Sequence, residues 1–293
     1  MNDIRAPRVA VLGLGTMGSL FARNAARAGM RVTVWDRTLQ PRTTAGEHVQ
    51  AAASAAEAAR EADAVVTVLL DAEAVLSVMR EQGAFNAMKA GSTWLQMSTI
   101  GVEGTEQAML LTATRPEIGF VDAPVSGSRY AAEKGNVVVL ASGDRDRASV
   151  AVQPFFNAIA GKVHWLGEAG QGTRIGLLFN AWIGILIENI AEVATLAQAL
   201  GIEPQRFAEL VSGGELVPPW ALEKLQKIVE NRTSEVEVPL RLAEKNVLLA
   251  LAAAGVARPR LPILNQIAVT WAEVAPDFGA ADISALHLAL QQW

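Results

Sequence analysis

Hydrophobic residues are spaced differently in the two halves of the chain. The first half contains short runs rich in β-branched residues that end at glycine or at a polar residue, which is typical of buried parallel strands. Stretches with helical spacing separate these runs, and the clearest is the alanine-rich segment 19–28. The strand-like runs are 8–12, 31–36, 62–70, 92–98, 119–126 and 136–143. Strands that alternate with helices predict an α/β fold with a doubly wound parallel sheet of the Rossmann type.

Beyond about residue 167, apolar residues recur at helical spacing only. The predicted helices cover 173–200, 204–212, 219–231, 240–254 and 262–275. No low-complexity linker precedes the first of them, so this long helix is expected to join the two parts of the chain directly. We therefore predict a Rossmann domain over 1–167 and an all-helical domain over 168–293.

Composition restricts the classes of partner. The chain is 51% hydrophobic and 19% charged, which predicts a globular protein with a sizeable core. Its net charge of -5 offers no basic surface for nucleic acid and no cationic face for a membrane, so we expect neither partner. The apolar stretch 176–197 contains Asn180, Glu188, Asn189 and Glu192, which favours a buried helix of a soluble protein over a membrane span.

Residue types needed for redox or metal chemistry are scarce. The absence of cysteine excludes disulfides, a thiolate nucleophile and an iron–sulfur site, and it suits a reducing cytoplasm. The histidines His48, His164 and His287 lack metal-ligand spacing, so we predict no metal site. The amino-terminal apolar run is too short for a secretory signal. We therefore expect a cytoplasmic protein that acts on small molecules.

The sequence GLGTMG matches the GxGxxG fingerprint and lies between a predicted strand and a predicted helix. Gly13 permits the tight turn, Gly15 lets the backbone approach a pyrophosphate, and Gly18 lets the helix pack closely on the strand. The amides and the positive dipole of the helix start then face the phosphates. The predicted dinucleotide site contains Gly13, Leu14, Gly15, Thr16, Met17 and Gly18.

The end of the second predicted strand gives two indications about the cofactor. Asp36 is placed to accept hydrogen bonds from ribose hydroxyls, which favours NAD, and its charge would repel a 2′-phosphate. Arg37 and Thr38 offer a guanidinium and a hydroxyl to that phosphate, which favours NADP. An alternative leaves Arg37 stacked on the adenine or in solvent. We predict that NADP(H) is preferred over NAD(H).

Short motifs along nearly the whole chain match one family. They are GLGTMG, WDRT at 35–38, MSTI at 97–100, DAPVSGS at 122–128, GQG at 170–172 and AEKNVLLAL at 243–251. On these motifs the chain resembles the β-hydroxyacid dehydrogenases, which include 3-hydroxyisobutyrate dehydrogenase and glyoxylate/succinic semialdehyde reductases, and the related imine reductases. The resemblance implies an NAD(P)-dependent oxidoreductase. It also implies a homodimer, because helical second domains of this family usually exchange helices between subunits.

The resemblance also assigns residues to substrate and cofactor. In that family the serine of the DAPVSGS loop holds the substrate carboxylate, which here implies Ser126 with the amides of Gly127 and Ser128. Lys245 matches a lysine that closes over the cofactor, although Asn246 replaces the aspartate that normally follows it. Leu70 and Thr99 complete the predicted cofactor-binding set.

The most informative departure from the family follows GQG. Where the family has a catalytic lysine and, four residues later, an asparagine, this chain has Gly176 and Asn180. Steps of three and four residues place Thr173, Gly176 and Asn180 on one face of a helix. We therefore predict that Asn180, Ser126 and Thr173 form the catalytic set and that Gly176 belongs to the substrate site.

Loss of the lysine changes the chemistry that is expected. Reduction of a carbonyl builds alkoxide charge, and a positioned proton donor accelerates it by roughly 10² to 10⁴. An imine can enter protonated and has less need of such a donor. Space at Gly176, with Trp182 and Trp220 as lining, would also admit a bulky, flat substrate.

These points favour an imine reductase-like activity, although imine reductases usually carry Asp or Tyr at the lysine position and a different substrate loop. The alternative is a β-hydroxyacid dehydrogenase or a semialdehyde or keto-acid reductase in which Tyr130 or another group donates the proton. A second alternative is a cofactor-binding protein without catalytic activity.

Overall fold

The computed structural model describes residues 6–38, 48–215 and 217–291. The chain forms two compact units, Met1–Gly176 and Leu177–Trp293, and the division falls inside the long helix α8 (Gln171–Ala199). The domain boundary predicted after residue 167, ahead of this helix, stays a prediction.

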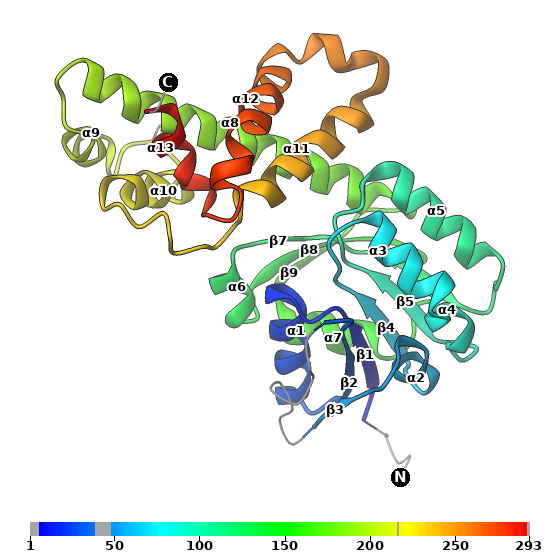
Figure 1. Cartoon of the computed structure of the whole chain (residues 1–293). Coiled ribbons are helices and arrows are strands. Elements are labelled where there is room, and N and C mark those ends of the chain that lie inside the picture. The colour runs from blue at the N-terminus through cyan, green and yellow to red at the C-terminus, as the bar shows by residue number, and fades with distance from the viewer. Residues whose placement is uncertain (1–5, 39–47, 216, 292–293) are drawn as a thin grey trace. The chain divides into compact units, whose positions relative to one another are not determined.

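The first unit is built on a nine-stranded sheet (Figure 1). The strand order along the sheet is β3 (Val49–Ala51), β2 (Arg31–Trp35), β1 (Arg8–Leu12), β4 (Ala64–Thr67), β5 (Thr93–Gln96), β6 (Gly119–Asp122), β8 (Val137–Gly143) and β7 (Val125–Ser126), while β9 (Ala160–Trp165) pairs with β8. From β3 to β6 all neighbours are parallel. The predicted Rossmann fold is confirmed.

One edge of the sheet differs from the prediction. The predicted strand 119–126 is two strands, β6 and β7, interrupted at Pro124, whose nitrogen has no hydrogen to donate to a ladder. The predicted strand 136–143 is β8, which runs antiparallel to both. The connection from β7 to β8 holds only the short helix α6 (Arg129–Glu133), too little for a parallel crossover. The doubly wound parallel sheet therefore has an antiparallel edge at β8.

Alternate residues of the central strand enter two separate cores. Val9 and Val11 belong to the core on one face, with α1 (Thr16–Arg27) and α7 (Val152–Ile159). Ala10 and Leu12 belong to the core on the other face, to which α2 (Ala55–Arg60), α3 (Ala72–Leu76), η2 (Ser77–Glu81), α4 (Ala84–Ala87) and α5 (Gly101–Ala113) contribute. This is the period of two that a strand covered on both faces requires.

The second unit is helical (Figure 1). Its elements besides the end of α8 are α9 (Pro204–Val211), α10 (Pro219–Val229), α11 (Leu240–Ala254), η3 (Gly255–Arg260), α12 (Pro262–Phe278), η4 (Ile283–Ala285) and α13 (Leu286–Leu290). The five predicted helices are confirmed, with ends that differ by at most a few residues. Ile187, Leu225, Val247 and Trp271 lie in one apolar core.

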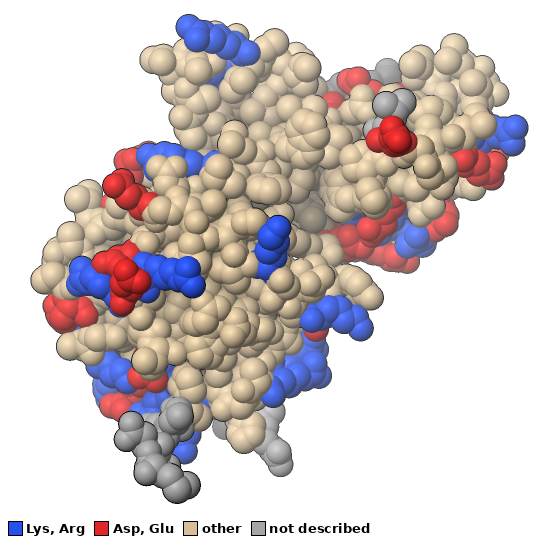
Figure 2. All heavy atoms as spheres, turned by 180° about the vertical axis from the view of Figure 1, so that it is seen from behind, with Lys and Arg blue, Asp and Glu red and all other residues tan. Residues whose placement is uncertain are grey.

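Among the described residues, only α8 is long and apolar enough to cross a membrane by length and composition. Of its most apolar 18-residue window, 39% is buried inside the protein. The face seen in Figure 2 is covered mostly by uncharged residues, and acidic and basic side chains lie close together in several places on it.

Candidate cofactor and substrate sites

The fingerprint glycines leave space at one position and are tightly packed at the other two. Gly13 has φ +104°, and a Cβ there would lie 2.2 Å from the carbonyl oxygen of Val68. A Cβ on Gly18 would lie 1.9 Å from the carbonyl oxygen of Gly13. A Cβ on Gly15 would meet no described atom within 4 Å. The turn therefore packs against the sheet and keeps open space at Gly15, where helix α1 begins.

The start of α1 suits an anion. Its N-cap is Gly15, no side chain caps it, and its first turn contains no acidic residue among the described atoms. The amides of Thr16 and Met17 belong to the group that has no partner inside a helix. Together with the space at Gly15, these amides fit the pyrophosphate of a dinucleotide.

Asp36 holds the glycine turn. Its Oδ2 accepts the amide of Leu14 at 2.8 Å, while Oδ1 accepts the amide and the hydroxyl of Thr38 at 2.8 and 3.1 Å. Arg37 lies between these bonded residues and is exposed. Both carboxylate oxygens thus already bind protein donors, which sequence alone did not indicate.

The predicted contacts Leu70 and Thr99 follow β4 and β5 at the carboxyl end of the sheet. Leu70 is 62% exposed and Thr99 is half-buried. The amide of Leu69 donates to Ser98 Oγ at 2.8 Å and joins the two loops. A buried cluster of hydrogen-bonded side chains, which sequence analysis did not predict, lies in and just after β4 and β5. It is formed by Thr67, Trp94, Gln96 and Ser98. Polar residues inside the apolar strands β4 and β5 were the available signal.

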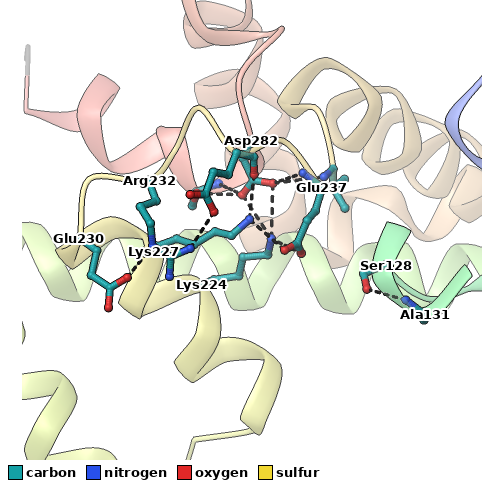
Figure 3. Close-up of polar contacts among 11 residues, drawn as sticks. Ser128, Ala131, Lys224, Lys227, Glu230, Arg232, Glu237 and Asp282 are labelled. Atoms are coloured by element: carbon teal, nitrogen blue, oxygen red, sulfur yellow. Dashed lines mark hydrogen bonds and ion pairs between the residues drawn. The ribbon is translucent and has the colours of Figure 1, made fainter. Parts of the chain in front are cut away.

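The predicted substrate loop lies at the edge of the sheet. Ser126 ends β7, is half-buried and pairs with Val138. Gly127 has φ +151°, a conformation that favours glycine. Ser128 Oγ accepts the amide of Ala131 at 3.3 Å and so caps α6 (Figure 3). The alternative proton donor Tyr130 is 65% exposed on α6.

Position 176 has room for a Cβ atom. A Cβ on Gly176 would lie 3.4 Å from Cγ of Pro124 and 4.0 Å from Cδ1 of Leu140, which are ordinary contacts. By contrast, a Cβ on Gly172 would lie 2.2 Å from the carbonyl oxygen of Leu140. Packing of the described residues therefore requires glycine at 172 but not at 176.

Thr173 lies in a buried polar network, and its predicted catalytic role stays a prediction. Its amide donates to Asp122 Oδ2 at 2.7 Å and its hydroxyl to Asp122 Oδ1 at 2.8 Å. Burial raises the pKa of Asp122, and the bonds from Thr173 and Ser142 only partly oppose this effect. The sequence contained Asp122 as the first residue of DAPVSGS, but nothing local indicated its partners.

In the second unit, Asn180 on α8 meets Asn246 on α11. Asn246 Nδ2 donates to Asn180 Oδ1 at 3.1 Å, and Asn246 Oδ1 is buried with no hydrogen-bond partner among the described residues. A Cβ on Gly184 would lie 2.9 Å from Val247 Cγ2, so the two helices pack closely here. Lys245, the predicted cofactor contact, is half-buried on α11.

The two tryptophans predicted to line a pocket have different surroundings. Trp182 is 61% exposed on α8. Trp220 packs against the helical core, and the Nζ atom of Lys224 lies 5.8 Å from its ring centroid. Their assignment to a substrate pocket stays a prediction.

A buried ion network is formed by Lys224, Lys227, Glu237 and Asp282 (Figure 3). Lys224 Nζ lies 3.0 Å from Glu237 Oε2 and 3.3 Å from Asp282 Oδ1. Lys227 Nζ lies 2.9 Å from Glu237 Oε1. Burial alone would raise the pKa of Asp282, but Lys224 and the amides of Glu237 and Val238 outweigh it and hold that pKa below its usual value. Sequence analysis did not predict this network. Among the described residues, no group of three or more His, Cys, Asp or Glu is arranged to hold a metal ion.

Comparisons with family models account for almost the entire chain. Residues 8–167 match the NAD-binding domain of 6-phosphogluconate dehydrogenase. Residues 170–290 match the NAD-binding model of NADP-dependent 3-hydroxyisobutyrate dehydrogenase.

Individual relatives agree with these models. The chain is 30% identical over 300 aligned positions to glyoxylate/succinic semialdehyde reductase 2, chloroplastic, of Arabidopsis thaliana, which covers 98% of this chain and 82% of that protein. The structure of 3-hydroxyisobutyrate dehydrogenase from Salmonella typhimurium is similar with a TM-score of 0.85 at 28% identity, covering 97% of this chain and 99% of that one. An imine reductase from Myxococcus stipitatus in complex with NADP⁺ gives a TM-score of 0.63 at 20% identity, over 97% and 100% of the two chains, and this likeness shows the fold alone.

Proposed function

The chain belongs to the β-hydroxyacid dehydrogenase superfamily of NAD(P)-dependent oxidoreductases, and on this premise we propose that it is an NADPH-dependent reductase that acts on a C=N bond. One observation carries the proposal. Glycine stands at position 176, where the resemblance expects the catalytic lysine, although a Cβ atom there would make only ordinary contacts with the described residues.

Glycine inside a helix costs stability. It is less favourable than alanine by about 1 kcal/mol, because glycine loses more backbone conformational entropy when the chain folds. At Gly172 and Gly184 close neighbours account for the glycine, whereas at Gly176 they do not. This contrast supports a functional reason for keeping the position empty of an ammonium group.

The chemistry near Gly176 follows from its neighbours. Pro124 and Leu140 present carbon atoms to this position. Arg174, the nearest cation along α8, pairs with Glu106 at 3.5 Å. A dinucleotide whose pyrophosphate is held by the fingerprint would supply the hydride from its nicotinamide ring. A protonated imine carries its proton into the site, so a surface without an acid suits it better than it suits a carbonyl.

The NADPH preference is supported by the bonds of Asp36. Because its two oxygens accept protein amides and a hydroxyl, the carboxylate serves the glycine turn. Arg37 is exposed beside it, and we propose that its guanidinium binds the 2′-phosphate.

We propose that Ser126 with Gly127 anchors the substrate.

We also propose that the protein is a homodimer. Three large apolar residues within two turns of α8 are exposed: Leu178 at 65%, Phe179 at 43% and Trp182 at 61%. Exposed apolar clusters of this kind commonly mark protein interfaces.

A panel of substrates tests the proposed activity. NADPH oxidation is followed with a cyclic imine, glyoxylate and succinic semialdehyde, and NADP⁺ reduction with 3-hydroxyisobutyrate. The proposal expects turnover of the imine. The second candidate, a semialdehyde or hydroxyacid enzyme, is favoured by the unaltered DAPVSGS loop and by the Arabidopsis relative. Tight NADPH binding with no turnover of any compound would favour a non-catalytic cofactor-binding protein.

A further inference from the structure

A fully buried carboxylate holds the beginning of α8. Asp122 is the last residue of β6 and has no exposed surface. Its Oδ2 accepts the amide of Thr173 at 2.7 Å and its Oδ1 accepts the hydroxyl of Thr173 at 2.8 Å. Ser142 Oγ lies 3.2 Å from the same Oδ2 and accepts the amide of Gly172 at 2.8 Å. Two first-turn amides of α8 are thus satisfied by side chains of β6 and β8.

This arrangement differs from an ordinary helix cap. A local cap uses a residue just before the helix, whose side chain moves with it. Here the acceptors come from the sheet, 51 and 30 positions away in the chain. The helix start is therefore fixed to the end of β6 and not only to its own preceding loop.

Among the residues that the structure describes, Asp122 is held by neutral hydrogen-bond donors and not by a cation. Its donors are the amides of Thr173 and Gly170 and the hydroxyls of Thr173 and Ser142. The positive end of the α8 dipole stabilises a carboxylate at this point as well. Removing the carboxylate would leave several buried donors without an acceptor. Removing one donor would break only its own hydrogen bond.

A third element joins the network. Thr105 Oγ1 lies 3.0 Å from Thr173 Oγ1 and donates to the carbonyl of Gly101 at 2.9 Å. Both Thr105 and Gly101 belong to α5, the helix that follows the loop with Thr99. The network thus links the beginnings of α5 and α8 to the end of β6.

Asp122 stands between the two parts of the proposed site in this unit. Pro124, two residues after Asp122, is the residue that a Cβ atom at Gly176 would contact. Ser126 follows it in β7. Gly176 lies one helical turn after Thr173. We propose that Asp122 is a positioning residue, which sets the distance between the Gly176 face of α8 and the substrate loop 124–126 through its bonds to Thr173. The proposal rests on the assignment of this loop and face to the substrate.

The test compares three variants in the intact protein. Asp122→Asn keeps the shape, removes the charge and replaces one of the two carboxylate acceptors by a donor. Thr173→Val removes the hydroxyl and keeps the shape, and Thr173→Ser keeps the hydroxyl. Hydrogen exchange of the peptides covering 171–180 and 185–199 is measured by mass spectrometry, together with melting temperature, NADPH affinity, and kcat and KM on the substrate that the panel identifies.

For Asp122→Asn we expect exchange over 171–180 to accelerate about tenfold or more, the worth of a hydrogen bond to a charged group, while 185–199 is unchanged. kcat should fall by roughly 100-fold, the effect of a displacement of about 1 Å, with NADPH affinity within a few-fold of the parent. Thr173→Val should show smaller changes in the same direction. Thr173→Ser, which keeps the hydroxyl, should have the exchange rate and kcat of the parent.

Two results would overturn the proposal. One is unchanged exchange over 171–180 in Asp122→Asn, and the other is a loss of kcat that is as large in Thr173→Ser as in Thr173→Val. If Asp122→Asn does not fold, the Thr173 pair alone decides. If no substrate is turned over by the parent, the proposed function fails, and the exchange measurement still decides whether Asp122 holds α8.

Discussion

The ammonium of Lys224 lies 3.3 Å from Oδ1 of Asp282, and neither side chain has exposed surface. Asp282 also accepts the amides of Glu237 and Val238 at 2.9 and 3.2 Å, immediately before α11 begins. Its carboxylate therefore joins α10, the segment that leads into α11, and η4. Loss of one partner would leave an uncompensated charge inside the helical unit.

We expect Asp282→Asn to lower the free energy of unfolding by about 3–5 kcal/mol, since the buried ammonium groups of Lys224 and Lys227 would then share the single carboxylate of Glu237. Because the folded-state pKa of Asp282 is lowered, its stabilisation is present above the unfolded-state value, near 3.9, and is lost as pH falls through the folded-state value. The difference between parent and variant should therefore be constant at neutral pH and shrink below about pH 4. Urea unfolding from pH 3 to 8 measures it.

The exposed pair of Arg232 and Glu235 provides the control. Arg232→Ala should change the free energy of unfolding by less than about 1 kcal/mol. Equal effects of the two substitutions would contradict the importance of burial.

Replacing Gly15 should separate cofactor binding from folding. The backbone at Gly15 has φ −62°, and a Cβ there meets no described atom within 4 Å, so Gly15→Val should fold. Its side chain would occupy the space of the pyrophosphate and weaken NADPH binding by roughly 100-fold or more, the loss of two or more charge-assisted bonds. Calorimetric titration and a thermal melt measure the two effects. Gly18→Val, whose Cβ would lie 1.9 Å from the Gly13 carbonyl oxygen, should instead impair folding. NADPH affinity unaltered in Gly15→Val would contradict the assignment of the site.

Arg37→Ala tests the proposed cofactor preference. We expect NADPH affinity to fall about tenfold or more and NADH affinity to stay the same, because only NADPH carries the 2′-phosphate. Arg31→Ala removes an exposed charge from the other end of β2 and should alter neither. Equal affinities for NADPH and NADH in the parent protein would remove the basis of this assignment.

Gly176→Ala tests whether packing requires the glycine. The added Cβ would make ordinary contacts with Pro124 and Leu140, so helix propensity should raise the free energy of unfolding by up to about 1 kcal/mol. Gly172→Ala should lower it by about 1–3 kcal/mol, since its Cβ would overlap a backbone oxygen. A destabilised Gly176→Ala would supply a structural reason for the glycine and weaken the functional one. Thermal and urea unfolding of both variants decide this point.

The parts of the fold that depend on neighbours in sequence could be predicted. The run from β1 through GLGTMG to β2 combines strand, turn and helix signals within about thirty residues, and the structure reproduces it. The direction of β8 depends on which strand it meets and on the length of the connection before it, and the apolar pattern of 136–143 contains neither. The edge strand β3 is short and half-exposed, so its pattern was too weak to detect.

The candidate site shows the same limit. Gly176 could be identified because its motif is local. Asp122 and Asp282 are short acidic residues that usually lie at the surface, and their burial depends on partners 51 and 58 positions away. The use of Asp36 as a support for the glycine turn was also hidden, because its partner Leu14 lies 22 positions before it.

The central claim is that this reductase works without a lysine acid, and Gly176→Lys tests it most directly. The new side chain would leave α8 against Pro124, beside the loop of Ser126, and would supply the missing proton donor to a carbonyl substrate. Burial depresses the pKa of a lysine, so exclusion of a bulky imine by volume is expected to matter more than charge repulsion.

The measurement is the ratio of kcat/KM for a cyclic imine to that for succinic semialdehyde, with NADPH, in the parent and in Gly176→Lys. Our account predicts a ratio above one in the parent and a fall of roughly 100-fold or more in the variant, the usual contribution of a general acid. A parent enzyme that reduces the semialdehyde efficiently and no imine, with a ratio unchanged by the lysine, would contradict it.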